Sequence, residues 1–373
     1  MIAFLQLTPA EDLPAIEAAI GRVIARGWFV LGPELEAFER AFADACQAPF
    51  AIGVGTGTDA LAIGLRALGI GPGDEVITSP LSAAYSALAI VMAGARPVFA
   101  DIDSDRLTLD PRAAAAAVSP RTAAIMPVHL YGQAADMPAI AAVAERHGLA
   151  ILEDCCQAHG ATSAGKPVGS FGTVAAYSFY PTKNLGALGD GGAITTTDAN
   201  IWARLKRLRN GGQTDRYHHA ELGVNSRLDE LQAAVLHARL PFLPRWTDRR
   251  RALARKYREA LAEADTIVVP PELDAGHVYH LFPVRSEERD AMQAHLRAAG
   301  VETLIHYPIP IPAQPAMSAL NPADCPIANR VCREIFSLPL HPRLPDEAIQ
   351  QVAEAVIKGP SPASARHERD AQR

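Results

Sequence analysis

Short β-rich runs alternate with helical patterns between residues 50 and 200 of the sequence. This alternation is typical of βα units, in which each strand is followed by a helix that packs on the sheet, and it predicts an α/β domain with a mostly parallel sheet. The helical patterns carry apolar residues at spacings of three and four, as helices that cover a sheet do. We expect such helices over residues 59–68, 136–147 and 199–209. Seven strands are expected, over residues 51–54, 75–78, 97–100, 124–128, 149–152, 174–178 and 193–196.

Two further helices are expected ahead of the sheet, over residues 11–26 and 34–46. The segment 27–33 between them is expected to pack across a neighbouring element or subunit. A long helical pattern begins at residue 228, and its two prolines, Pro241 and Pro244, predict a kink at a hinge between domains. With 373 residues the chain is long enough for two cores. We predict a large domain over 1–245, a smaller α+β domain over 246–358 and a disordered tail over 359–373.

The charge balance argues against nucleic acid and anionic membranes as partners. The chain has 35 Lys+Arg against 41 Asp+Glu, a net charge of −6, and so no basic excess that could neutralise a run of phosphates. The longest weakly polar stretch, residues 83–95, is shorter than the about 20 apolar residues that span a bilayer. The first residues lack a basic head and a cleavage site, so we expect a cytoplasmic protein. Five irregularly spaced cysteines indicate free thiols and no metal site.

Two segments at expected strand ends have the residues of a ligand site. Residues 54–61 place glycines and threonines between a strand and a helix, as in an anion-binding helix N-terminus, although such a turn can equally serve backbone geometry alone. The spacing matches neither a dinucleotide-binding fingerprint nor a P-loop. Residues 149–152 lead into Glu153 and Asp154, at the strand end where open α/β sheets bind ligands. Because side chains alternate along a strand, only one of these two acids can face the crevice.

Lys183 lies in a Gly-rich turn between two apolar strands, within residues 176–193. A lysine on a solvated helix face would not have such neighbours. A lysine that is held away from water loses its proton more readily and can form a Schiff base. A surface ion pair is the usual role of a lone lysine, and the flanking glycines alone do not decide between the two.

Four segments, residues 55–61, 153–161, 178–193 and 223–234, occur in the order known from one protein family. Together they resemble the DegT/DnrJ/EryC1/StrS family of pyridoxal-phosphate sugar aminotransferases, over roughly residues 5–355. The resemblance implies a large domain of fold type I, like that of aspartate aminotransferase, and a homodimer whose active sites are built from both subunits. It also implies pyridoxal 5′-phosphate, alternating with its pyridoxamine form, as the cofactor.

The same resemblance implies a role for each matching residue. Lys183 matches the Schiff-base lysine and Asp154 matches the acid that pairs with the pyridinium nitrogen, so these two are the expected catalytic residues. A carboxylate at that nitrogen favours the protonated ring, which accepts the electron pair left when the Cα–H bond breaks. Lys183, once released, would move the proton between Cα and C4′. The other cofactor-binding residues implied are Gly57, Thr58 and Ser178 at the phosphate, Asn225 reaching the phosphate from the partner subunit, and Gln157 beside the ring hydroxyl.

This chain departs from the family at the residue that stacks on the cofactor ring. The family commonly has an aromatic residue three or four positions after the equivalent of Pro80, and this chain has Ala83 and Ala84 there. Tyr85 follows one or two positions too late. Either Tyr85 turns inward or an aliphatic face covers the ring, and we include Tyr85 among the expected cofactor-binding residues.

The resemblance also implies the substrates: L-glutamate or glutamine as amino donor and a nucleotide-linked keto sugar as acceptor. Residues 303–310 resemble the loop of members that aminate the 3-position of a dTDP-3-oxo-6-deoxyhexose. The expected substrate-binding residues are His159, Tyr180, His306 and Tyr307, with packing in the small domain as the alternative for the last two. Where relatives continue with Pro-His, this chain has Ile311-Pro312 after Pro310, which leaves the sugar and the nucleotide open.

Three rival functions remain. A sugar dehydratase of this family would have histidine in place of Lys183. An aminotransferase for a 4-oxo nucleotide sugar or a cyclitol ketone would share every motif except the substrate loop. A non-catalytic regulator that binds the cofactor would not need Lys183 and Asp154, and the chain has neither a DNA-binding module nor a basic surface charge.

Overall fold

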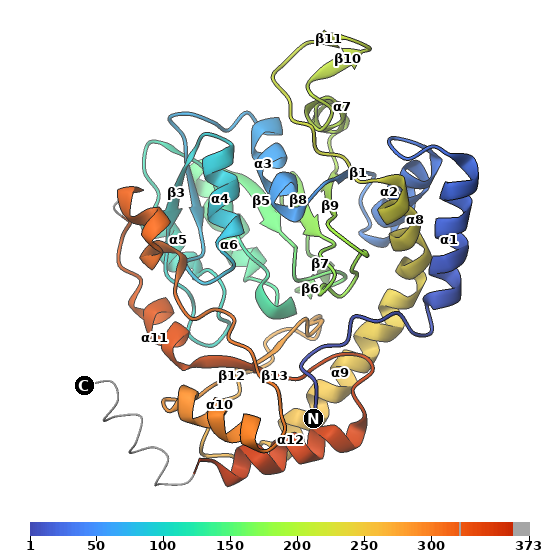
Figure 1. Cartoon of the computed structure of the whole chain (residues 1–373). Coiled ribbons are helices and arrows are strands. Elements are labelled where there is room, and N and C mark those ends of the chain that lie inside the picture. The colour runs from blue at the N-terminus through green and yellow to red at the C-terminus, as the bar shows by residue number, and fades with distance from the viewer. Residues whose placement is uncertain (321, 361–373) are drawn as a thin grey trace.

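The computed structural model describes residues 1–320 and 322–360. Its centre is a seven-stranded sheet with the strand order β1-β9-β8-β5-β4-β2-β3 (Figure 1). Within this sheet β9 runs antiparallel to both of its neighbours and the other pairs are parallel, so the predicted mostly parallel sheet is confirmed. The strands are β1 (Phe50–Val54), β2 (Glu75–Thr78), β3 (Arg96–Phe99), β4 (Thr122–Met126), β5 (Ala150–Asp154), β8 (Val174–Ser178) and β9 (Gly192–Thr196).

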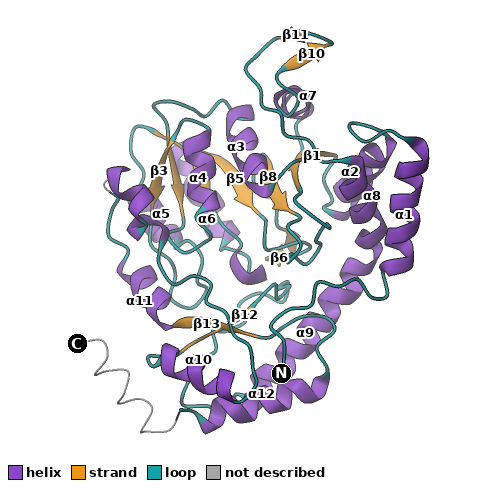
Figure 2. Cartoon of the chain, viewed as in Figure 1, coloured by secondary structure: helices purple, strands orange, loops and turns teal. Residues whose placement is uncertain are grey.

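Helices cover both faces of the sheet and give three layers (Figure 2). Buried strand residues such as Ile52 and Leu152 pack on one face against α3, α4 and α7. Their neighbours Ala51 and Ile151 pack on the opposite face, which α2, α5, α6 and α8 cover. The helices are α1 (Leu13–Arg26), α2 (Pro33–Ala45), α3 (Gly57–Ala67), α4 (Tyr85–Met92), α5 (Pro111–Ala116), α6 (Met137–His147), α7 (Ala199–Leu208) and α8 (Glu230–Arg239), with a 3-10 turn, η1, at Leu130–Gly132.

The seven strands and the helices α1, α2, α3, α6 and α7 lie where the hydrophobic periodicity predicts them, whereas α4 and α5 are not among the predicted helices. The seven strand boundaries differ from the predictions by at most two residues, and β5 runs on to include Glu153 and Asp154. Two small hairpins without a clear pattern in the sequence are added in loops. They are β6 (Thr162–Ser163) with β7 (Lys166–Pro167), and β10 (Gln213–Asp215) with β11 (His218–His219), the second of which extends away from the body of the protein in Figure 1.

The long helix expected from residue 228 is interrupted where its prolines lie. A 3-10 turn, η2 (Leu240–Phe242), contains Pro241 and separates α8 from α9 (Leu243–Ala260). Beyond it, α9 packs with an antiparallel pair of strands and two helices around a separate apolar cluster. These are β12 (Phe282–Arg285), β13 (Ile335–Leu338), α10 (Arg289–Ala298) and α12 (Asp346–Lys358). The boundary predicted near residue 245 lies in the first turn of α9, and the division into two domains stays a prediction.

The remaining C-terminal elements return to the sheet layer. They are η3 (Ile311–Ala313), η4 (Pro315–Leu320) and α11 (Pro326–Glu334), which pack with Phe4, Leu81 and Tyr131 in one apolar cluster. Most of the tail predicted to be disordered, residues 361–373, lies outside the described residues. In the part of the chain that the structure describes, no helix is both long enough and apolar enough to cross a membrane.

A buried carboxylate joins the N-terminal helices to α8. Glu230, which is 0% exposed, accepts backbone N–H hydrogen bonds from Gly32, Glu34 and Leu35, each at 2.9 Å. These N–H groups belong to the first turn of α2, where a helix has no partners of its own for them. A carboxylate at this end of a helix is also favoured by the helix dipole. Glu230 therefore fixes where α2 begins.

We predict that Glu230→Ala lowers the free energy of unfolding by about 2–4 kcal/mol, because it leaves buried N–H groups without an acceptor. Denaturant unfolding followed by circular dichroism measures the loss. The matched control is Glu36→Ala, on the exposed side of α2, where the carboxylate lies 3.9 Å from Arg40 and a change below about 0.5 kcal/mol is expected. Equal losses in the two variants would contradict the capping role.

Candidate active site

A cavity of about 1080 Å³ lies at the carboxyl ends of the strands. The N-terminus of α3, the ends of β5 and β8, the turn after β8 and residues 303–307 form its walls. Ten of the twelve predicted site residues line it: Gly57, Thr58, Tyr85, Asp154, Gln157, Ser178, Tyr180, Lys183, His306 and Tyr307. The edge of the sheet at which a ligand was expected is thus the edge at which the cavity opens.

The two acids at the end of β5 point to opposite sides of the sheet, as the alternation of side chains predicts. Asp154 lines the cavity. Its Oδ2 accepts a hydrogen bond from Ser86 Oγ at 2.8 Å and its Oδ1 accepts one from the Cys156 N–H at 3.1 Å. These two donors hold the carboxylate in one orientation. Ser82 Oγ lies 3.3 Å from Ser86 Oγ and continues this buried row of hydroxyls.

Glu153, on the other side, has a structural role. Its two oxygens accept hydrogen bonds from the backbone N–H groups of Gly169, Phe171 and Gly172, each at 2.8 Å. They also accept one from His129 Nε2 at 3.1 Å. Glu153 therefore holds the loop that leads into β8.

His129, Glu153 and Cys155 place potential metal-ligand atoms within 4.8 Å of one another. Internal hydrogen bonds account for this cluster. His129 Nδ1 accepts from the Ala135 N–H at 3.0 Å, so the ring proton lies on Nε2, which donates to Glu153. Both ring nitrogens are occupied, and the cluster carries no metal proposal.

Lys183 lies in a tight turn that follows β8. A Cβ at Gly186 would come within 2.5 Å of Pro181 O, so the turn requires glycine at that position. Burial lowers the pKa of the Lys183 ammonium below its ordinary value. The neighbouring Cys156 and Asp154 raise this pKa, but their effect is smaller than that of burial. The amine therefore loses its proton more readily than that of an exposed lysine.

Asn184 anchors this turn to the segment before β12. Its Nδ2 donates to Val278 O at 3.1 Å, and its Oδ1 lies 3.2 Å from His280 Nδ1. Because Val278 O can only accept, the amide oxygen faces His280 and His280 Nδ1 carries the proton. Burial lowers the pKa of His280 well below its ordinary value, so the ring is neutral. His280 lines the cavity, although no sequence motif singled it out.

The start of α3 forms a compact cradle. Thr56 caps the helix by accepting from the Asp59 N–H at 3.0 Å. A Cβ at Gly57 would lie 2.6 Å from Ser178 Cβ, so the backbone approaches β8 as closely as glycine permits. Gly57 and Thr58 in this first turn and Ser178 at the end of β8 line the cavity. The first N–H groups of a helix have no partner within the helix and can bind a ligand. A helix N-terminus with flanking hydroxyls suits a phosphate group.

Gln157 is oriented by hydrogen bonds on both of its amide atoms. Its Oε1 accepts from the Tyr131 N–H at 2.8 Å, and its Nε2 donates to Tyr307 OH at 3.0 Å. Burial raises the pKa of Tyr307 to about 12 and lowers the pKa of His306 to about 4. Both side chains are therefore uncharged at neutral pH and face the cavity as neutral hydrogen-bonding groups.

Two predicted site residues do not line the cavity. His159 is 1% exposed and packs against the rings of Tyr177 and Phe179, and burial lowers its pKa to about 3. Its ring lies among aromatic core residues, and its expected contact with substrate stays a prediction. Asn225 forms an antiparallel backbone bridge with Asn210 and does not line the cavity of its own subunit. Its expected contact is with the partner subunit's cofactor, and that expectation stays a prediction.

Tyr85, at the start of α4, lies on the rim and is 63% exposed. Its place as the ring-stacking residue also stays a prediction.

The residues that the motifs missed, Ser82, Ser86 and His280, come from segments with ordinary apolar composition. For the two serines a weak signal exists, because both follow the carboxyl end of β2, the edge of the sheet at which a ligand is expected.

Comparison with solved structures gives the class of protein. The fold superposes with a TM-score of 0.92 on Streptomyces venezuelae DesV in complex with a ketimine intermediate, at 47% identity, covering 96% of this chain and 98% of that one. It superposes with a TM-score of 0.90 on NtdA of Bacillus subtilis with the bound cofactor PMP, at 31% identity, covering 96% of this chain and 85% of that one. The fold is that of an aminotransferase.

Sequence comparison gives the family. The DegT/DnrJ/EryC1/StrS aminotransferase family matches residues 12–357. The chain is 48% identical over 360 residues, 95% of each chain, to dTDP-3-amino-3,4,6-trideoxy-α-D-glucose transaminase of Streptomyces venezuelae. The chain belongs to the DegT/DnrJ/EryC1/StrS aminotransferase family, as its four motifs predict.

We predict that Ser86→Ala lowers kcat about tenfold and weakens cofactor binding, because Asp154 loses a hydrogen bond that holds its charged oxygen in place. Steady-state kinetics and titration of the cofactor-free protein by absorbance measure the two effects. Ser82→Ala is the control, since its hydroxyl does not reach Asp154, and a much smaller change is expected. A kcat for Ser86→Ala within twofold of the parent would show that Asp154 does not depend on this bond.

Proposed function

We propose that the chain transfers an amino group from L-glutamate or glutamine to the ketone of a nucleotide-linked sugar, with pyridoxal 5′-phosphate bound at Lys183. The observation that carries the proposal is that Lys183, Asp154 and the cradle at the start of α3 face one cavity. These are the three groups that a pyridoxal phosphate site requires: an amine, a carboxylate and an anion-binding helix end.

The residues present fit the cofactor. Gly57, Thr58 and Ser178 would hold the phosphate, Asp154 the ring nitrogen and Lys183 the aldehyde carbon. A side chain larger than hydrogen at Gly57 would collide with Ser178, so the glycine lets the start of α3 lie directly beside the hydroxyl of Ser178. When bound, the cofactor supplies the electron sink for the pair left by the Cα–H bond.

The chain's own residues would move the proton. Burial lowers the pKa of Lys183, so after release its amine would lose its proton more readily than that of an exposed lysine, and it could then take the proton from Cα and return it on the other side of the reaction. Asp154 stays in place through Ser86 and the Cys156 N–H while charge develops at the ring. The neutral His306 and Tyr307 can orient hydroxyl groups of a sugar without attracting a proton themselves.

The size and lining of the cavity support a large acceptor. A volume of about 1080 Å³ exceeds what the cofactor and glutamate need, and residues of the expected substrate loop, Thr303, Leu304, His306 and Tyr307, line it. We propose a dTDP-3-oxo-6-deoxyhexose as the acceptor, from the likeness of that loop and from the similar Streptomyces venezuelae transaminase. Where the family loop continues with Pro-His, this chain has Ile311-Pro312, and the proline side chain has no hydrogen-bonding group that could take the place of the histidine.

We also propose a homodimer with shared active sites. The segment between α1 and α2 exposes Trp28, Phe29 and Val30 by 53%, 49% and 41%, and exposed apolar groups of this kind mark interaction surfaces. Tyr217 and Leu222, in and after the hairpin of β10 and β11, are 76% and 87% exposed. We propose that a second copy covers these residues and that Asn225 of each subunit reaches the phosphate in the other subunit's cavity.

The acceptor is tested by steady-state kinetics with four ketones: dTDP-3-oxo-6-deoxyglucose, dTDP-4-oxo-6-deoxyglucose, a UDP-linked 3-oxo sugar and a cyclitol ketone. We predict a kcat/KM for the first that exceeds the others by about tenfold or more. A preference for the 4-oxo sugar or the cyclitol would replace our acceptor and keep the aminotransferase. Failure of all four with a cofactor-loaded protein would favour the regulator.

We predict that Lys183→Ala abolishes turnover and the absorbance of the lysine-bound cofactor, because none of the other described residues that line the cavity is a lysine. Lys358→Ala, at the exposed end of α12, is the control and should leave both unchanged. Absorbance spectra and single-turnover assays measure the effect. Turnover of Lys183→Ala near the parent rate would disprove the Schiff-base role.

Shared sites are tested by mixing two inactive variants. Asn225→Asp should be inactive, because it places a negative charge beside the phosphate. A mixed dimer of Lys183→Ala with Asn225→Asp contains one intact site if Asn225 acts across the interface. Co-expression with two different tags should therefore restore about a quarter of the parent activity in the mixture. No recovery in purified mixed dimers would place both residues in the same subunit's site.

A further inference from the structure

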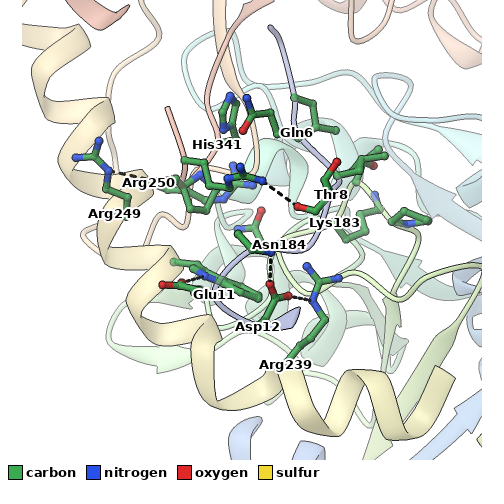
Figure 3. Close-up of a pocket in the computed structure, with 18 of the residues that line it drawn as sticks. Gln6, Thr8, Glu11, Asp12, Lys183, Asn184, Arg239, Arg249, Arg250 and His341 are labelled. Atoms are coloured by element: carbon green, nitrogen blue, oxygen red, sulfur yellow. Dashed lines mark hydrogen bonds and ion pairs between the residues drawn. The ribbon is translucent and has the colours of Figure 1, made fainter. Parts of the chain in front are cut away.

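A second cavity, of about 360 Å³, adjoins the first at Lys183 (Figure 3). Leu5, Thr182 and Lys183 line both cavities. The other walls are the N-terminal segment up to Asp12, the end of α8, the start of α9 and residues 341–343. Five arginines line it, Arg239, Arg245, Arg249, Arg250 and Arg343, and we call it the arginine cavity.

Three of these arginines have acidic partners. Arg239 pairs with Asp12 at 2.9 Å, Arg245 pairs with Glu11, and Arg249 pairs with Asp346 at 2.6 Å. Within residues 1–320 and 322–360, neither Arg250 nor Arg343 forms an ion pair with a carboxylate. The arginine cavity therefore has more positive than negative charge in its walls.

Arg250 is a buried cation that has no carboxylate counter-ion among the residues that the structure describes. Arg250 is only 4% exposed. Its Nη1 donates to the carbonyl oxygens of Tyr279, His280 and Leu340. Its Nε has no hydrogen-bond partner among the described residues. Burial lowers the pKa of Arg250 to about 10, so it remains charged at neutral pH. A buried charge in this state is costly unless an opposite charge comes near it.

Arg343, which also lines the arginine cavity, is exposed and has N–H groups that are not used in the hydrogen bond to Thr8. Its Nη1 donates to Thr8 O at 2.9 Å, which uses one of the five N–H groups of a guanidinium. The planar fork of a guanidinium matches the two oxygens of a carboxylate or phosphate. Thr8 belongs to the N-terminal segment that forms part of the same wall, so the segment and Arg343 are held together at the cavity.

We propose that the arginine cavity binds a small oxyanion, a carboxylate or a phosphate, through Arg250 and Arg343. A volume of about 360 Å³ admits such an ion or a short dicarboxylate, whereas the nucleotide sugar requires the larger cavity. This site is separate from the phosphate cradle, which lies at the start of α3. Because Lys183 lines both cavities, an anion here places negative charge close to the catalytic amine and favours its protonated form.

The test is isothermal titration calorimetry on the cofactor-loaded protein, in which the phosphate cradle is filled. Inorganic phosphate and succinate, an unreactive dicarboxylate, are the two probes, and they distinguish a phosphate ligand from a carboxylate ligand. We expect saturable binding of at least one of them. Arg343→Gln keeps a donor for Thr8 O but removes the charge, and it should weaken that binding at least fivefold. Arg343→Lys keeps the charge and should restore most of it.

Arg112→Gln, on exposed α5, is the matched control and should bind the probe as the parent does. Melting temperature and kcat of Arg343→Gln at saturating substrates, measured in parallel, check that the variant is folded. No saturable binding of either probe to the parent would overturn the proposal. Binding to Arg343→Gln as tight as to the parent would also overturn it, because the probe would then lie elsewhere, for example in the larger cavity.

Discussion

The alternation of side chains along β5 is the constraint on which the site depends. Two adjacent carboxylates at the end of one buried strand must point to opposite sides. Glu153 binds four hydrogen-bond donors and holds the loop before β8. Asp154 faces the cavity and is held by Ser86 and the Cys156 N–H. One carboxylate thus fixes the framework, and the other is left for chemistry at the edge of the sheet where the strand ends.

The turn that carries Lys183 connects this edge to the C-terminal part of the chain. Asn184, the next residue, bonds to Val278 and His280, so the position of the lysine depends on the segment that enters β12. Tyr307 reaches the same cavity through its bond with Gln157. Groups from both parts of the chain therefore meet around the amine. A movement of the C-terminal part relative to the sheet would alter the surroundings of Lys183.

The sequence predicted local features well and long-range contacts poorly. Strand positions follow from apolar periodicity, and the alternation at Asp154 follows from strand geometry. Ser86 and Arg250 were missed, because their importance comes from residues 68 and 90 positions away and leaves no local pattern. His159 lies within a motif, but its ring packs against Phe179 in the core and does not line the cavity. A motif identifies the neighbourhood of a site, and only packing tells which of its side chains face inward.

The central claim is that one cavity carries both halves of an amino transfer. The most direct measurement is the absorption spectrum of the cofactor-loaded protein, recorded before and after addition of L-glutamate and then of a dTDP-3-oxo-6-deoxyhexose. We predict a band of the lysine-bound cofactor that fades with glutamate and returns with the keto sugar. A band that does not respond to glutamate or glutamine, or no band at all with cofactor supplied, would contradict the account.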